Sequence, residues 1–322
     1  MRLRSVSCQS PGWRRVRHGR GFRYLDENGR PLGAAQVDRV KALVIPPAWT
    51  DVWVCPDERG HLQAVGTDDA GRRQYLYHPE WRRKRDAEKF DRAIELGRRL
   101  PALRASIGRM LAGDPAERST VVAAAVRLLD LGCFRLGSDA YAEENGSFGL
   151  TTLRVRHVHR TNGARTFRFQ GKSGVDHEIA VTDAAVVRVV DALTEHRGRA
   201  GRFLATPHGR RWRAIDAGEV NDLIRGLSCL DVTAKDFRTW KATVTVATEL
   251  AGTRRADTAS RRARQIREAV DVAAELLGNT PTVARKSYVD PRVIDLFEDG
   301  TTMAAARSED GIDRAVVRLL TQ

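Results

Sequence analysis

The chain has 322 residues, with 55 Lys and Arg against 41 Asp and Glu, and its net charge is +14. No segment approaches the roughly 18 consecutive apolar residues of a membrane-spanning helix, and the charged N-terminus lacks the apolar run of a secretory signal. An excess of positive charge this large favours a polyanionic partner, and nucleic acid is the first expectation. The four cysteines lie far apart without a CxxC pair, which indicates neither a zinc site nor a disulfide framework: Cys8, Cys55, Cys133 and Cys229.

The basic residues are clustered along the chain. Residues 1–23 hold seven Arg and no acid, residues 82–85 read Arg-Arg-Lys-Arg, and residues 253–268 hold six Arg against two acids. Each run alone is typical of a solvated surface, but the three runs and the overall excess together favour DNA or RNA binding. Only seven of the 55 basic residues are lysine. Because arginine keeps its proton in proteins, a lysine in this background is a candidate proton donor.

Two domains are predicted, with the boundary in the basic stretch, at 1–85 and 86–322. Residues 22–80 read as β-rich, and "HLQAVGTDDAGRRQYLYH" predicts two strands around an Asp-Asp-Ala-Gly turn. A helical pattern begins at about residue 86. We expect this helix to stop at Pro101 and the next helix to begin at Asp114-Pro115.

The second domain is predicted to hold a three-stranded meander followed by helices. "TTLRVRHVHR" ends at the Thr161-Asn162-Gly163 turn, "ARTFRFQ" returns, and "VDHEIAV" forms the third strand after Gly171-Lys172-Ser173-Gly174. Thr233 and Asp236 resemble a capping box at the start of one helix. Helices are expected near 182–196, 216–227, 233–251, 257–277 and 281–287.

The Gly-Lys-Ser triplet at 171–173 raises the possibility of an ATP-binding loop. Such a loop needs a second glycine five residues earlier, where this chain has Thr166, and it should open a helix rather than a strand. Lys172 is therefore predicted to lie at the tip of a β-hairpin and to have a role other than binding a nucleotide phosphate.

Four segments, taken in order, resemble the catalytic domain of type IB DNA topoisomerases of the compact poxvirus and bacterial kind. They are "FRLGSDAY" at 134–141, "GKSGVDHE" at 171–178, "KDFRTW" at 235–240 and "GNTPTVARKSY" at 278–288. "GLTTL" at 149–153 extends the resemblance, and "IPPAWTDV" and "GTDDAGRRQYLY" resemble the N-terminal module of that family. The resemblance implies an α+β fold, with a small β-rich DNA-clamp domain before a mostly helical catalytic domain that contains the three-stranded antiparallel sheet.

The resemblance also implies the site residues and their roles. Arg135 and Arg238 match the catalytic arginines, Lys172 the hairpin lysine, and Tyr288 the nucleophile that forms a 3′-phosphotyrosyl link. Supercoils would be relaxed by a monomer closed around double-stranded DNA, without metal, ATP or another cofactor, in the cytoplasm at the nucleoid. Asn279 departs from the poxvirus enzymes, which carry histidine there; its amide can donate a hydrogen bond but carries no charge.

These residue types suit transesterification at a DNA phosphate. Guanidinium groups and an amide would stabilise charge on the nonbridging oxygens, and Lys172 would protonate the leaving 5′-oxygen. No dedicated base for Tyr288 is evident. Asn279 could instead be a helix C-cap, and the alternating His157 and His159 could suggest a metal pair, although a third ligand is missing and contact with DNA or solvent is favoured.

The expected DNA contacts come from both domains: Arg72, Gln74, Tyr75 and Tyr141. Gln74 and Tyr75 match positions that touch the major groove, but a regular strand points them to opposite faces, which leaves open that one packs instead. A tyrosine recombinase is the nearest alternative; Lys235, where recombinases usually carry histidine, and the β-rich first domain oppose it. A non-catalytic DNA-binding protein is the other alternative.

Overall fold

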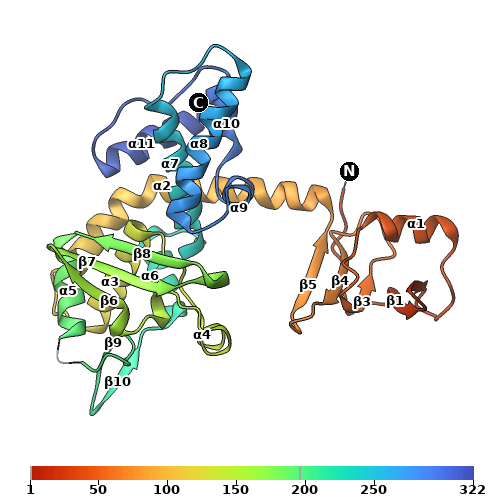
Figure 1. Cartoon of the computed structure of the whole chain (residues 1–322), viewed down its shortest axis with the longest axis horizontal. Coiled ribbons are helices and arrows are strands. Elements are labelled where there is room, and N and C mark those ends of the chain that lie inside the picture. The colour runs from red at the N-terminus through yellow and green to blue at the C-terminus, as the bar shows by residue number, and fades with distance from the viewer. Residues whose placement is uncertain (1, 196) are drawn as a thin grey trace. The chain divides into compact units, whose positions relative to one another are not determined.

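The computed structural model describes residues 2–195 and 197–322 (Figure 1). The chain divides into two compact units, Met1–Glu88 and Lys89–Gln322. Within the described residues, no helix is long and apolar enough to cross a membrane.

The first unit is a five-stranded antiparallel sheet with one helix. The strand order is β2-β1-β3-β4-β5, and the β4–β5 hairpin confirms the two strands predicted around the Asp-Asp-Ala-Gly turn. Helix α1 interrupts the predicted β-rich region. The elements are β1 (Trp13–His18), β2 (Gly21–Leu25), α1 (Ala34–Ala42), β3 (Thr50–Val54), β4 (Leu62–Thr67) and β5 (Arg73–Tyr77).

One face of this sheet packs against α1. Trp13, Val54 and Ala64 are buried there together with Val40 of α1. Strand β5 alternates between the two faces, so that Leu76 contacts this core while Tyr75 is exposed. The alternation of the sequence therefore decides which side chains of β5 remain available to a partner.

The second unit is mostly helical and contains the predicted antiparallel sheet, in the order β6-β7-β8. Its first strand is shorter than predicted, because most of "TTLRVRH" forms two short 3₁₀ turns and the strand begins only at Val158. Helices α3 and α5 contact this sheet. Three elements of this unit were not predicted from the sequence: the hairpin of β9 (Ala205–His208) and β10 (Arg211–Ala214), helix α10 (Pro291–Glu298) and helix α11 (Glu309–Leu320). The helices are α2 (Pro79–Leu111), α3 (Arg118–Gly132), α4 (Asp139–Asn145), α5 (Ala184–Thr194), α6 (Ala217–Ser228), α7 (Ala234–Ala251), α8 (Ala259–Leu277), α9 (Pro281–Ser287), α10 (Pro291–Glu298) and α11 (Glu309–Leu320). The strands are β6 (Val158–Thr161), β7 (Ala164–Gln170), β8 (Asp176–Val181), β9 (Ala205–His208) and β10 (Arg211–Ala214).

Three predicted helix boundaries were wrong. Helix α2 begins at Pro79 rather than at about residue 86. Helix α2 continues through Pro101, because Leu100, Leu103 and Ile107 are all buried along its length. Burying these side chains contributes more than the ~3 kcal/mol that an internal proline costs a helix. Helix α3 begins at Arg118 rather than at Asp114-Pro115, since residues 114–117 form a turn in which the Asp114 carboxylate accepts the backbone N–H of Ala116.

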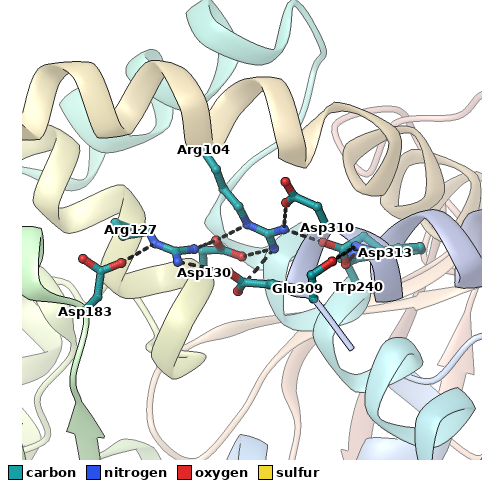
Figure 2. Close-up of polar contacts among 10 residues, drawn as sticks. Arg104, Arg127, Asp130, Asp183, Trp240, Glu309, Asp310 and Asp313 are labelled. Atoms are coloured by element: carbon teal, nitrogen blue, oxygen red, sulfur yellow. Dashed lines mark hydrogen bonds and ion pairs between the residues drawn. The ribbon is translucent and has the colours of Figure 1, made fainter. Parts of the chain in front are cut away.

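A buried ion cluster joins the last helix, α11, to the rest of the unit (Figure 2). Arg104 of α2 donates to Asp130 of α3 at 2.8 Å and to Asp313 of α11 at 2.6 Å. Asp313 also accepts the indole N–H of Trp240 in α7 at 2.7 Å. Burial lowers the pKa of Arg104, but the hydrogen bonds and charges of Asp130 and Asp313 outweigh it and raise that pKa. Four helices are therefore held at one point.

The cluster extends along α3 through Arg127. This side chain pairs with Asp130, with Asp183 at 3.1 Å, and with Glu309 of α11 at 3.0 Å. Figure 2 shows the two guanidinium groups flanking the Asp130 carboxylate. Because the guanidinium fork satisfies several carboxylate oxygens at once, these charges can be buried without leaving any of them unpaired.

Asp313→Ala is expected to lower the free energy of unfolding by about 3 kcal/mol, because it leaves a buried guanidinium short of one carboxylate and the Trp240 indole without its acceptor. Urea denaturation measures the loss. Asp310→Ala is the matched control, since this side chain also pairs with Arg104 but is 40% exposed. It should cost less than about 1 kcal/mol. Equal losses in the two variants would contradict the role given to Asp313.

Candidate active site

Helix α7 places Arg238 inside the second unit. The helix begins with the predicted capping box, in which the Asp236 carboxylate accepts the backbone N–H of Thr233 at 2.8 Å. From there, Phe237, Arg238 and Trp240 are all buried. An arginine in such surroundings needs partners for its charge, because an unpaired buried cation costs several kcal/mol.

The partners of Arg238 are carbonyl groups at the ends of two helices. One terminal nitrogen donates to the carbonyl of Cys133, the C-cap of α3, and the other donates to the carbonyl of Leu277, the last residue of α8, at 2.8 Å. Helix C-termini carry partial negative charge, so both ends stabilise the cation. The Nε–H is buried without a hydrogen-bond partner in the described residues.

Arg135 lies two residues beyond the left-handed turn at Cys133, whose φ is 53°. Its guanidinium donates to the Oδ1 atom of Asn279 at 2.7 Å. Burial lowers the pKa of Arg135, and the charge of Arg238 lowers it further, while Tyr288 acts in the opposite direction. Two cations that repel each other in a partly buried pocket form a site that favours an anion between them.

Asn279 follows the end of α8, and its backbone and side chain have separate tasks. Gly278, with φ of 58°, is the C-cap, and the backbone N–H of Asn279 donates to the carbonyl of Ala274 at 3.0 Å. Since Arg135 can only donate, the amide oxygen must face it. The amide nitrogen, Nδ2, is then buried without a hydrogen-bond partner in the described chain. The side chain is therefore not a simple helix cap.

Tyr288 closes helix α9, which begins with Thr280 as N-cap and Pro281 in the first turn. The guanidinium carbon of Arg238 lies 5.3 Å from the centre of the Tyr288 ring. The backbone carbonyl of Tyr288 accepts from the Thr243 hydroxyl of α7 at 3.3 Å. The Tyr288 side chain is partly buried, and no hydrogen bond joins its hydroxyl to a carboxylate or an imidazole in the described residues.

Lys172 lies in the turn of the β7–β8 hairpin, as predicted. Strands β7 and β8 pair from Arg165–Val181 to Gln170–Asp176, and the Gly171 N–H donates to the Val175 carbonyl at 2.7 Å. The side chain of Lys172 is exposed and makes no ion pair within the described part of the chain. A strand follows this turn rather than a helix, which removes the ATP-loop interpretation.

One pocket brings most of these groups together. Its lining includes Arg135, Lys172, Asn279 and Tyr288, and a smaller adjoining pocket is lined by Arg135 and Arg238. His177 lines both pockets and was missed by the sequence analysis, although it stands within "GKSGVDHE".

Comparisons with known proteins agree with this constellation. The family model described as eukaryotic DNA topoisomerase I, catalytic core, matches residues 78–308, and that of the bacterial DNA topoisomerase IB N-terminal domain matches residues 21–68. The chain belongs to the type IB DNA topoisomerases. DNA topoisomerase 1B of Acanthamoeba polyphaga mimivirus is 27% identical over 92% of this chain and 90% of its own length. DNA topoisomerase 1B of vaccinia virus (strain Copenhagen) is 21% identical over 79% and 80%.

The expected DNA contacts of this topoisomerase differ in their surroundings. Arg72 and Gln74 both donate to the Asp68 carboxylate, at 3.0 and 2.8 Å. The backbone N–H of Arg72 and then its guanidinium lower the pKa of Asp68 to about 2. Gln74 is half-buried on the face of Leu76, whereas Tyr75 is 45% exposed and stacks on Tyr77 with ring centres 6.2 Å apart.

Three further residues complete the comparison with the sequence. Tyr141 belongs to α4, but its side chain lies outside the described residues. His157 and His159 do not form a metal pair: His157 accepts the backbone N–H of Arg154 at 3.1 Å and packs edge-on against Phe148. No group of three potential metal ligands occurs in the described residues.

Asn279→Ala is expected to slow DNA cleavage by about a hundred- to a thousandfold, the range for losing one donor to a developing oxyanion. Because alanine also removes the acceptor of Arg135, Asn279→Asp is the matched control: it keeps that acceptor but replaces the free donor by a charge that repels phosphate. Single-turnover cleavage should be slow in both variants, while Asn279→His should stay active. If Asn279→Asp cleaves as fast as the wild type, the amide is not a phosphate donor.

Proposed function

We propose that this topoisomerase cuts one strand of duplex DNA by attack of the Tyr288 hydroxyl on a phosphate, forming a 3′-phosphotyrosyl link and releasing the 5′-oxygen. The observation that carries the proposal is a pair of buried donors that have no hydrogen-bond partner within residues 2–195 and 197–322, Arg238 Nε and Asn279 Nδ2. Buried polar groups are nearly always hydrogen-bonded in proteins. Two unsatisfied donors near a tyrosine fit an anion that arrives with the substrate.

The nonbridging oxygens of that phosphate gain charge as the tyrosine attacks. Arg135, Arg238 and Asn279 would stabilise this charge, and their orientation is fixed beforehand by carbonyl and amide partners in the protein. Donors held in place need little reorganisation during the reaction, which is why such groups are effective. Arg238 would bind this phosphate mainly through its Nε–H, because each of its terminal nitrogens already donates to a backbone carbonyl.

The departing 5′-oxygen needs a proton, and Lys172 is the proposed donor. Its place in a short turn between two strands allows the amine to approach the leaving group without moving the arginines. The Tyr288 hydroxyl loses its proton to solvent as it attacks. Religation is the reverse step: the 5′-hydroxyl attacks the phosphotyrosine and returns its proton to the lysine, while the departing Tyr288 oxygen takes a proton back from solvent. The number and type of phosphoester bonds are the same before and after, so the cycle requires no ATP.

Duplex DNA is the proposed partner of both units. The exposed Tyr75 and Tyr77 of the first unit and the basic residues 82–85 supply surfaces suited to bases and phosphates. We propose that a monomer closes around the duplex as a clamp, and that it acts on chromosomal DNA in the cytoplasm, at the nucleoid.

Tyr288→Phe is expected to abolish the covalent DNA adduct, because it removes the attacking oxygen, while leaving affinity for duplex DNA within about threefold, since many phosphate contacts supply affinity. Denaturing gels detect the adduct and a filter assay measures affinity. The wild type should relax supercoils in EDTA without ATP. An adduct in the variant would show that another residue is the nucleophile.

Lys172→Ala tests the proton donor. Replacing the scissile 5′-oxygen by sulfur gives a leaving group whose thiol has a pKa of ~8.5, far below the pKa of the alcohol that an oxygen leaving group forms, so it departs without a proton. We expect Lys172→Ala to cleave ordinary DNA at least about a hundredfold slower than wild type. On the sulfur-substituted strand it should approach the wild-type rate.

Arg135→Ala is the control for that experiment. If Arg135 stabilises the nonbridging oxygens, sulfur should restore much less of its activity. Equal impairment of Lys172→Ala on oxygen and sulfur would exclude proton donation and favour phosphate binding by Lys172.

A further inference from the structure

The imidazole of His177 occupies an unusual place beside the proposed catalytic residues. It projects from the start of β8 opposite Phe169 of β7, and the two rings stack with centres 5.1 Å apart. The ring is partly buried and makes no hydrogen bond to another residue in the described part of the chain. Its position is therefore set by packing rather than by polar partners.

The first neighbour of this ring is Gly171, which immediately precedes Lys172. A Cβ atom built on Gly171 would lie 2.5 Å from His177 Cδ2 and 2.6 Å from Nε2. The φ of Gly171 is −95°, a value that any residue can adopt. The imidazole, not the backbone conformation, is thus what requires glycine at this position.

The second neighbour is Gly278, which immediately precedes Asn279. A Cβ atom on Gly278 would overlap His177 Cε1 and approach Nδ1 to 3.1 Å. One imidazole therefore fills the space between the β7–β8 turn and the turn after α8. These two turns are far apart in sequence, and each continues directly into a proposed catalytic residue.

We infer that His177 is a positioning residue that sets the β7–β8 turn against the turn after α8, and thereby places Lys172 relative to Asn279 and the phosphate. The inference rests on the proposed roles of those two residues. Proton donation to a departing oxygen requires the lysine amine and the phosphate to meet within hydrogen-bond distance. A ring packed against the glycine before each residue fixes that spacing.

The surroundings indicate that the ring acts by its shape. Burial lowers the pKa of His177, and the charges of Arg135 and then Arg238 lower it further. A neutral ring stacked on Phe169 avoids adding a third cation to this pocket. A flat ring without nitrogen atoms, such as the somewhat larger phenyl ring, should therefore serve better at this position than a side chain without a ring.

The test adds a methyl group at Gly171 and removes the ring at His177, first singly and then together. We expect Gly171→Ala to slow single-turnover cleavage at saturating DNA by about tenfold or more, because displacing a catalytic group by ~1 Å has effects of that size. His177→Ala should slow cleavage by a similar factor. Once the ring is gone, however, the added methyl has room, so the double variant should be less than about twofold slower than His177→Ala alone. Additive losses, or a Gly171→Ala enzyme with wild-type activity, would overturn the inference.

Two more readouts separate positioning from general loss of structure. His177→Phe should cleave faster than His177→Ala, since a flat ring again fills the space between the two glycines, although a phenyl ring is larger than an imidazole. A His177→Phe enzyme no faster than His177→Ala would contradict a role that rests on the ring's shape. The sulfur-substituted strand should restore most of the activity of Gly171→Ala, because a displaced Lys172 is no longer needed there. A defect of Gly171→Ala that is the same on oxygen and sulfur would also overturn the inference.

The proposed function is judged separately, on the wild type and on Tyr288→Phe. If the wild type forms its adduct through Tyr288 while the Gly171 and His177 variants behave independently, the positioning role alone fails. If Tyr288→Phe still forms the adduct, the proposed function fails whatever the cleavage rates of the Gly171 and His177 variants are.

Discussion

The guanidinium of Arg238 is the group on which the arrangement of the active site depends. It is only 4% exposed, and it is held between the carbonyls of Cys133 and Leu277 at the C-terminal ends of α3 and α8. The chain leaving the first helix leads to Arg135, and the chain leaving the second leads to Asn279. One buried cation therefore fixes the starting point of both segments, and two negative helix ends make its burial tolerable. Its Nε–H has no hydrogen-bond partner among the described residues, and it is the donor that we propose for the substrate phosphate.

The position of Arg238 depends in turn on helix α7, and the contacts of Trp240, two residues after Arg238, hold that helix in place. Trp240 packs against Gly97 of α2 so closely that a Cβ atom on that glycine would overlap the indole, and its N–H is fixed by Asp313. Because Asp313 belongs to the Arg104 cluster, the last helix, α11, contributes to the placement of Arg238. The family match ends at residue 308, just before this helix. Stability at the end of the chain and geometry at the active site are thus linked through one indole ring.

Local signals in the sequence predicted the elements that depend on local interactions. The hairpin turns, the capping box at Thr233 and the β7–β8 turn around Lys172 all follow from turn chemistry and alternation, and each was confirmed. Pro101 misled the prediction because its cost to a helix is a local quantity, whereas the burial of Leu100 and Leu103 is set by contacts with distant segments. Helix α1 and the β9–β10 hairpin were missed because their own patterns are short and weak.

At the active site, the sequence could supply residue types but not the direction of individual donors. Nothing in "GNT" indicates that the Asn279 amide points its oxygen toward Arg135 and leaves its nitrogen without a hydrogen-bond partner in the described residues. That orientation is set by Arg135, which lies 144 positions away in sequence. The same contact explains how asparagine can serve where the resembling poxvirus enzymes carry histidine. A protonated imidazole could not accept from Arg135 and would add a third positive charge beside two arginines. In the mechanism that we propose, the amide gives up that charge, but it orients Arg135 and offers one donor to the phosphate, so orientation would replace part of the electrostatic attraction.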